Sequence, residues 1–116
     1  MTMAQRIRTI KPQFWGSHDT ARLSRDARLL FIGLISMADD EGRFLASSAA
    51  ISGYVFPNDE IPAKKLREWV NELADVGVIH LYNIQGVSYG QIPTFRTHQR
   101  ISHPMESVLP GPENAE

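Results

Sequence analysis

The sequence contains no cysteine, no apolar run that approaches the ~20 residues of a membrane span, and almost no net charge. The absence of cysteine excludes disulfides and thiolate metal sites. No apolar segment follows the first six residues, so we expect no secretory signal. Together these absences predict a cytoplasmic protein that makes no use of a membrane.

The signatures of common catalytic sites are also missing. The chain has no P-loop, no GxGxxG and no GxSxG, and it offers no convergent set of catalytic groups. Its four histidines lack HExxH-type spacing, and the acidic run at residues 39–41 does not match an EF-hand loop. We therefore expect no enzymatic activity, no metal site and no cofactor.

Charge is nearly balanced overall but is unevenly distributed along the chain. Twelve basic residues against thirteen acidic residues give a net charge of −1. Residues 1–28 carry six basic and two acidic groups, whereas residues 29–63 carry one basic and five acidic groups. A positive face can therefore exist despite the balance, and the alternative is a solvated mixed surface.

Three main helices are predicted from hydrophobic spacing and end signals. Ser24 is a suitable N-cap for a central helix that extends to Ala38. A second, shorter helix covers residues 49–55 and is capped by Ser47 or Ser48. The third helix is amphipathic, begins with Pro62 in its first position and ends at Gly77.

A β-hairpin follows the third helix directly. Two strand patterns cover residues 78–84 and 87–95, and a two-residue turn at Gln85-Gly86 would place Tyr82 opposite Tyr89. Helices followed by such a hairpin are typical of an α+β winged helix-turn-helix. We assign the winged-helix domain to residues 1–104 and a flexible, acidic, proline-containing tail to residues 105–116.

The segment before the helices is interpreted from its alternation and its aromatic residues. Residues 6–10 fit a short N-terminal strand. Phe14 and Trp15 are expected to be core anchors that pack against the helices. Residues 43–45 form a short connector or strand between the first two main helices.

Nucleic-acid binding is the remaining candidate function. In a winged helix the third helix enters the major groove and the hairpin contacts the DNA backbone. Basic groups on that helix and in the flanking segments can neutralise phosphates, and Asn71 can contact a base edge. The candidate DNA-binding residues are Arg6, Arg8, Lys11, Arg43, Lys64, Lys65, Arg67, Asn71, Arg96, His98, Gln99 and Arg100.

Two features weigh against DNA contact. Glu68, Glu72 and Asp75 share the third helix with its basic residues, and the hairpin tip at residues 83–88 carries no charge. The alternative role for the flanking arginines is to pair with the acidic turns at residues 39–41 and 59–60 and so hold the chain ends down.

Residues 6–15, Arg-Ile-Arg-Thr-Ile-Lys-Pro-Gln-Phe-Trp, resemble the opening of a group of phage and prophage proteins. These proteins are commonly linked to DNA replication and have a winged-helix N-terminal region. Further similar segments follow in the same order, at residues 27–34, 39–43, 55–57, 69–77 and 89–101. The resemblance covers roughly residues 5–104.

The resemblance implies a winged-helix DNA-binding protein of phage or prophage origin, located in the cytoplasm of the bacterial host, that acts in DNA replication or transcriptional control. The expected partner is double-stranded DNA, with a second copy of the chain and a replication or host protein as further partners. Relatives often continue into a longer C-terminal region, so the chain is either a stand-alone module or a fragment. The competing hypothesis is a protein-interaction or dimerisation module that uses the same fold without DNA.

Overall fold

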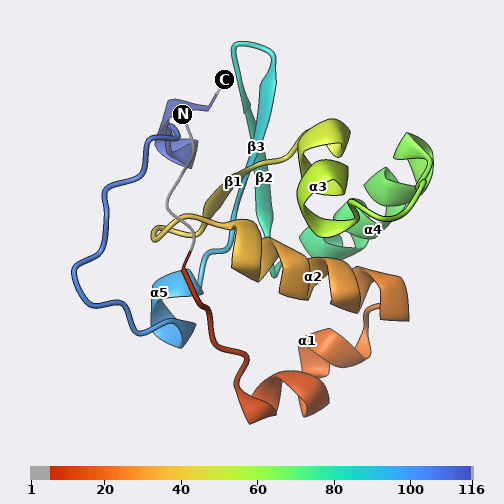
Figure 1. The fold of residues 1–116 in the computed structure, drawn as a ribbon, viewed down its shortest axis with the longest axis horizontal. Coiled ribbons are helices and arrows are strands. Elements are labelled where there is room, and N and C mark those ends of the chain that lie inside the picture. The colour runs from red at the N-terminus through yellow and green to blue at the C-terminus, as the bar shows by residue number, and fades with distance from the viewer. Residues whose placement is uncertain (1–5, 116) are drawn as a thin grey trace.

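The computed structural model describes residues 6–115, which form a mixed α+β fold of short helices and a three-stranded antiparallel sheet (Figure 1). No helix in this part of the chain is long and apolar enough to cross a membrane. In chain order the elements are η1 (Pro12–Gly16), α1 (His18–Ala21), α2 (Arg25–Met37), β1 (Arg43–Leu45), α3 (Ser48–Val55), α4 (Ala63–Val76), β2 (His80–Ile84), β3 (Val87–Gln91), α5 (Phe95–His98) and η2 (Pro112–Asn114).

Helix α2 is the central helix that the sequence predicts. The Ser24 side chain accepts a hydrogen bond from the Ala27 amide, so the predicted N-cap is confirmed. Leu30 and Leu34 are fully buried on one face, as the helical spacing requires. The helix ends at Met37, one residue earlier than predicted, because Ala38 is already extended.

Helices α3 and α4 pack beside α2, and their predicted ends are largely confirmed. Ser47, rather than Ser48, caps α3 by accepting from the Ala50 amide. Pro62 is the N-cap of α4 and not its first helical residue, so this detail of the prediction is wrong. Gly77 ends α4 with a φ of 92°, a left-handed conformation that glycine adopts without steric cost.

The sheet has the order β1-β3-β2, so the hairpin strand β3 lies between its partner β2 and the short strand β1. Tyr82 pairs with Tyr89, and Gln85 and Gly86 form the two-residue turn with φ values of 50° and 79°. Two consecutive positive φ values are typical of the type I′ hairpin turn. The predicted hairpin register is therefore confirmed, and residues 43–45 are a strand.

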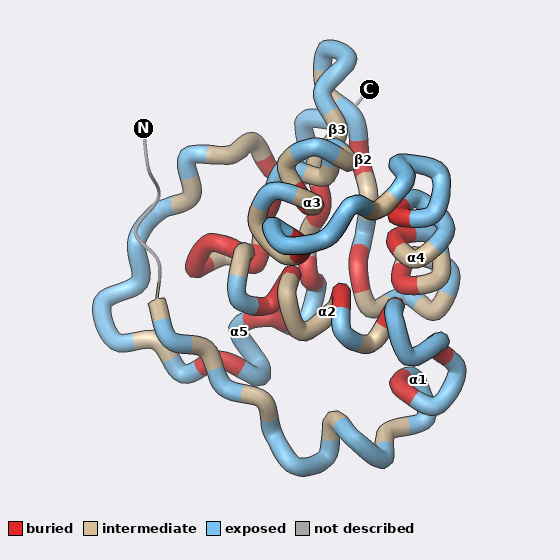
Figure 2. Tube along the Cα trace, turned by 45° about the vertical axis from the view of Figure 1, so that its right-hand side comes forward, coloured by how far each residue is buried: buried red, intermediate tan, exposed pale blue. Residues whose placement is uncertain are grey.

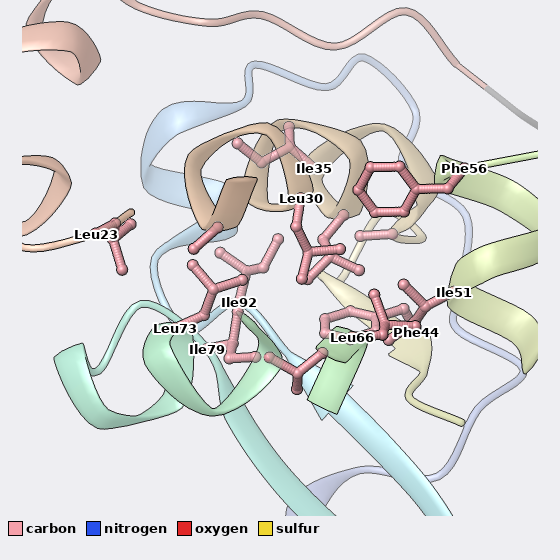
Figure 3. Packing of buried hydrophobic residues seen from close by; sticks show 14 of the residues in the cluster. Leu23, Leu30, Ile35, Phe44, Ile51, Phe56, Leu66, Leu73, Ile79 and Ile92 are labelled. Atoms are coloured by element: carbon pink, nitrogen blue, oxygen red, sulfur yellow. The ribbon is translucent and has the colours of Figure 1, made fainter. Parts of the chain in front are cut away.

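The hydrophobic core lies where α2, α3 and α4 meet the inner face of the sheet (Figure 3). Phe44 from β1, Ile51 from α3 and Leu66 from α4 are each at most 1% exposed. Figure 2 shows many of the buried positions in this region and further ones in the loop between α2 and β1, while the hairpin tip is exposed. The helix–helix–hairpin unit is thus held together by one core.

The predicted N-terminal strand is wrong. Residues 6–11 form no strand, and the backbone of Thr9 bonds instead to the side chain of Gln99. The Thr9 amide donates to Gln99 Oε1 at 2.9 Å, and Gln99 Nε2 donates to the Thr9 carbonyl at 2.9 Å. A side-chain amide thus satisfies the groups that a strand neighbour would otherwise satisfy.

The aromatic pair near the N-terminus differs from the expected core anchors. Phe14 is half-buried and stacks on Phe31, with ring centroids 5.9 Å apart. Trp15 is 63% exposed and contacts Phe14 edge-on, so its assignment to the core is wrong. Trp15 lies on the short helix η1, which contains no buried residue.

The C-terminal strap, which we define as residues 105–115, lies against the domain where a flexible tail was expected. The Met105 amide donates to Asp40 Oδ2 at 2.8 Å, and the Ser107 amide donates to Glu41 Oε2 at 3.0 Å. Further along, the Tyr82 hydroxyl donates to the Pro110 carbonyl at 2.7 Å. The strap is held because its backbone groups meet partners just before β1, at Asp40 and Glu41, and on β2, at Tyr82.

Candidate nucleic-acid interface

The exposed face of α4 carries the best-placed candidate DNA-binding residues. Lys64, Arg67 and Asn71 are all exposed and are spaced three and four residues apart, which places them on one side of the helix. The opposite side of α4 is anchored in the core by Leu66 and Leu73. The helix therefore presents two cations and one amide to solvent on a firmly packed scaffold.

A pocket of about 180 Å³ separates this face from the hairpin. Arg67 and Asn71 line it from α4, and Asn83 and Ser88 line it from the hairpin. The Ser88 hydroxyl donates to Asn83 Oδ1 at 2.9 Å across the two strands. The result is a concave surface with one cation and several neutral hydrogen-bonding groups.

Of the residues that line this pocket, the sequence predicts only Arg67 and Asn71 of α4 to bind DNA. Asn83 and Ser88 of the uncharged hairpin tip and Ser48 at the start of α3 also line the pocket. The hairpin register could have identified Asn83 and Ser88 as neighbours, since a two-residue turn makes them direct partners across the strands.

Some of the acidic residues of α4 have partners within the protein, which reduces their repulsion of a bound anion. The Glu72 carboxylate accepts from the Ser24 amide at 2.8 Å and from the Ser24 hydroxyl at 2.7 Å. Glu72 thus faces the N-terminus of α2, where a negative charge is favourable. Lys65 and Glu68 form an exposed ion pair at 3.4 Å, so Lys65 is not a free cation.

Arg6 and Arg8, which the sequence predicts to contact phosphates, form ion pairs within the protein. Arg8 Nη2 lies 3.0 Å from Asp40 Oδ1 and 3.0 Å from the Ala38 carbonyl, and its guanidinium stacks over the Phe95 ring. Its side chain is 5% exposed and that of Asp40 is 2% exposed. Arg6 Nε lies 3.3 Å from the same carboxylate. Arg8 therefore cannot reach a phosphate without breaking a buried ion pair.

Asp40 is the centre of this cluster, and its pKa reflects competing influences. Burial is the largest single influence and raises the pKa of the carboxyl group, but the Met105 amide and the Arg8 and Arg6 guanidinium groups together outweigh it. The net result is a pKa below the ordinary value of 3.8. Asp40 is therefore ionised at neutral pH and binds both the N-terminal segment and the C-terminal strap.

Three further candidates also have internal partners. Arg43 Nη1 donates to the Leu109 carbonyl at 3.0 Å and lies 3.6 Å from Glu41. Arg96 Nη1 donates to the Asp40 carbonyl at 3.4 Å. Gln99 is buried and bonded to Thr9, so we remove it from the interface. These contacts support the alternative that the flanking basic residues hold the chain ends.

The remaining candidates are exposed but lie away from α4. Lys11, His98 and Arg100 belong to the N-terminal segment and to the region of α5. Figure 1 shows α5 on the opposite side of the molecule from α4. The structure therefore does not bring all of the predicted residues into one surface.

No group of three or more histidine, aspartate or glutamate side chains within residues 6–115 is arranged to hold a metal ion. No family model, curated protein or solved structure matches the chain. The phage resemblance stays a prediction, and the functional argument depends on the geometry of α4 and the hairpin.

Proposed function

We propose that residues 6–115 form a winged helix-turn-helix module that binds double-stranded DNA, with α4 as the recognition helix and the β2–β3 hairpin as the wing. The element order supports this, because α2, β1, α3, α4 and the hairpin follow one another as in that fold and the strand order is β1-β3-β2. The observation that carries the proposal is the exposed row Lys64, Arg67 and Asn71 on α4, next to the hairpin.

The charge distribution determines which residues we assign to DNA. Lys64 and Arg67 form no ion pair among the described residues, whereas Lys65, Arg8 and Arg43 each lie beside a carboxylate. A cation without an internal ion pair can replace condensed counterions on a phosphate backbone without first losing a carboxylate partner. We therefore narrow the interface to the α4 face and the pocket beside the hairpin.

The test is a fluorescence anisotropy titration of a random duplex at two salt concentrations. The double variant Lys64→Glu/Arg67→Glu is compared with Arg22→Glu/Arg25→Glu, which makes the same change in net charge at two exposed residues outside α4. We expect the α4 variant to bind much more weakly, and its salt slope to fall by about two units, because each phosphate contact contributes about 0.9. We expect the matched control to retain most of the affinity.

Asn71→Ala separates base contact from phosphate contact. Its salt slope should equal that of the wild type, while its preference among duplex sequences should weaken. Equal loss of binding in both double variants would show that only net charge matters and would overturn the proposal. The role in replication or transcriptional control stays a prediction from the phage resemblance.

A further inference from the structure

A second apolar region, which shares no lining residue with the pocket beside α4 and the hairpin, combines an exposed aromatic side chain with a pocket. Trp15 is 63% exposed on η1, on the lower rim of the molecule in Figure 1. Tryptophan is enriched among the residues that contribute most of the binding energy at protein interfaces. Phe14 holds the indole edge-on, with ring centroids 5.1 Å apart, so the side chain is supported rather than free.

The pocket lies directly beside this residue. It has a volume of about 350 Å³ and opens between the N-terminal segment, α1, α2 and α5. Phe14, Phe31, Ile35 and Phe95 supply apolar walls. Its volume falls in the range of about 300–1,000 Å³ that is typical of sites for ligand-sized apolar groups. The chain thus places an exposed indole within one residue of an apolar pocket.

The pocket lining also carries one charge of each sign. Lys11 and Asp19 both line it, and neither forms an ion pair within residues 6–115. The Lys11 ammonium lies 3.5 Å from the Thr97 carbonyl, which leaves its charge uncompensated. In a two-fold interface the same patch meets itself, so the cation of each copy can face the carboxylate of the other, and the apolar group of each copy can face the other's pocket.

We propose that this surface is a symmetric dimer interface, in which Trp15 of each copy enters the other copy's pocket and Lys11 of each copy faces Asp19 of the other. A second copy is the occupant because the chain supplies both the insert and the receiving site. The interface lies away from the α4 face, so it leaves the proposed DNA surface open. It does not depend on DNA binding.

The test is sedimentation velocity of the full chain over a range of concentrations, without nucleic acid. We expect a reversible dimer for the wild type. Trp15→Ala should raise the dimer dissociation constant at least about 30-fold, which is the hot-spot threshold of about 2 kcal/mol converted at 1.4 kcal/mol per factor of ten. Leu29→Ala, which removes a 54%-exposed side chain on α2, is the matched control and should dimerise like the wild type.

A charge swap tests the orientation of the two copies. Lys11→Glu and Asp19→Lys should each weaken the dimer, because each places like charges opposite one another, and the double variant should restore it. Circular dichroism checks that every variant is folded. The proposal is overturned by a wild type that stays monomeric up to about 1 mM, by Trp15→Ala that dimerises normally, or by a double variant weaker than both single variants.

Discussion

Replacing Asp40 by asparagine tests whether one carboxylate holds both ends of the chain. In the wild type Asp40 lies 3.0 Å from Arg8 and 3.3 Å from Arg6, and it accepts from the Met105 amide at 2.8 Å. Asparagine has the same shape but no charge. The variant leaves the Arg8 guanidinium, which is 5% exposed, without a counterion.

The expected cost follows from burial. Removing one partner of a buried ion pair typically costs about 3–5 kcal/mol, because the other charge stays buried and uncompensated. Arg6 is partly exposed, and Arg8 keeps its bond to the Ala38 carbonyl, so we expect the low end, about 3 kcal/mol. This is a large share of the ~5–15 kcal/mol that stabilises a typical domain.

The assay is urea unfolding at pH 7, followed by circular dichroism, with Asp75→Asn as the matched control. Asp75 is exposed on α4, so its substitution should change the free energy of unfolding by less than about 0.5 kcal/mol. The double variant Arg8→Met/Asp40→Asn should lose less than the sum of the two single variants, since it leaves no buried charge. Equal destabilisation in Asp40→Asn and Asp75→Asn would refute the account of the cluster.

The remaining predictions concern acid and the end of α4. Because the folded-state pKa of Asp40 is lowered, its stabilising contribution is complete above its ordinary pKa of 3.8 and is lost as the pH falls through the folded-state value. The difference in unfolding free energy between wild type and Asp40→Asn should therefore shrink below about pH 3.8 in acid titrations. Gly77→Ala should cost about 1 kcal/mol in urea unfolding, because alanine is strained at a φ of 92°. Gly53→Ala, at an exposed helical glycine with open space around it, should not be destabilising.

The features that were predictable from the sequence are those that a few neighbouring residues determine. The Ser24 cap, the left-handed Gly77 and the Gln85-Gly86 turn each act within one turn of helix or one hairpin. The amphipathic spacing of α4 likewise identifies its buried face. These local signals agree with one another, which is why the order of the main helices and the hairpin register could be inferred.

The errors concern segments whose conformation depends on distant partners. Residues 6–10 alternate like a strand, but their neighbour in space is the Gln99 side chain, 90 positions from Thr9. Trp15 belongs to a class of residue that is usually well buried, yet the short helix η1 leaves it exposed. The C-terminal strap has the composition of a tail, and it is held because its backbone amides meet Asp40 and Glu41.

The proposed interface on α4 shows why the net charge of a helix is a poor guide to the charge that its exposed face presents. In the sequence three basic residues are offset by three acidic ones, which predicts a neutral helix. In the structure Glu72 faces the N-terminus of α2, and Lys65 and Glu68 neutralise each other. Lys64 and Arg67 remain on the exposed side beside Asn71, with Asp75 three turns from Lys64. Two cations without an ion pair among the described residues therefore lie in the N-terminal half of α4. Under the proposed function, that half of the recognition helix would contact base edges.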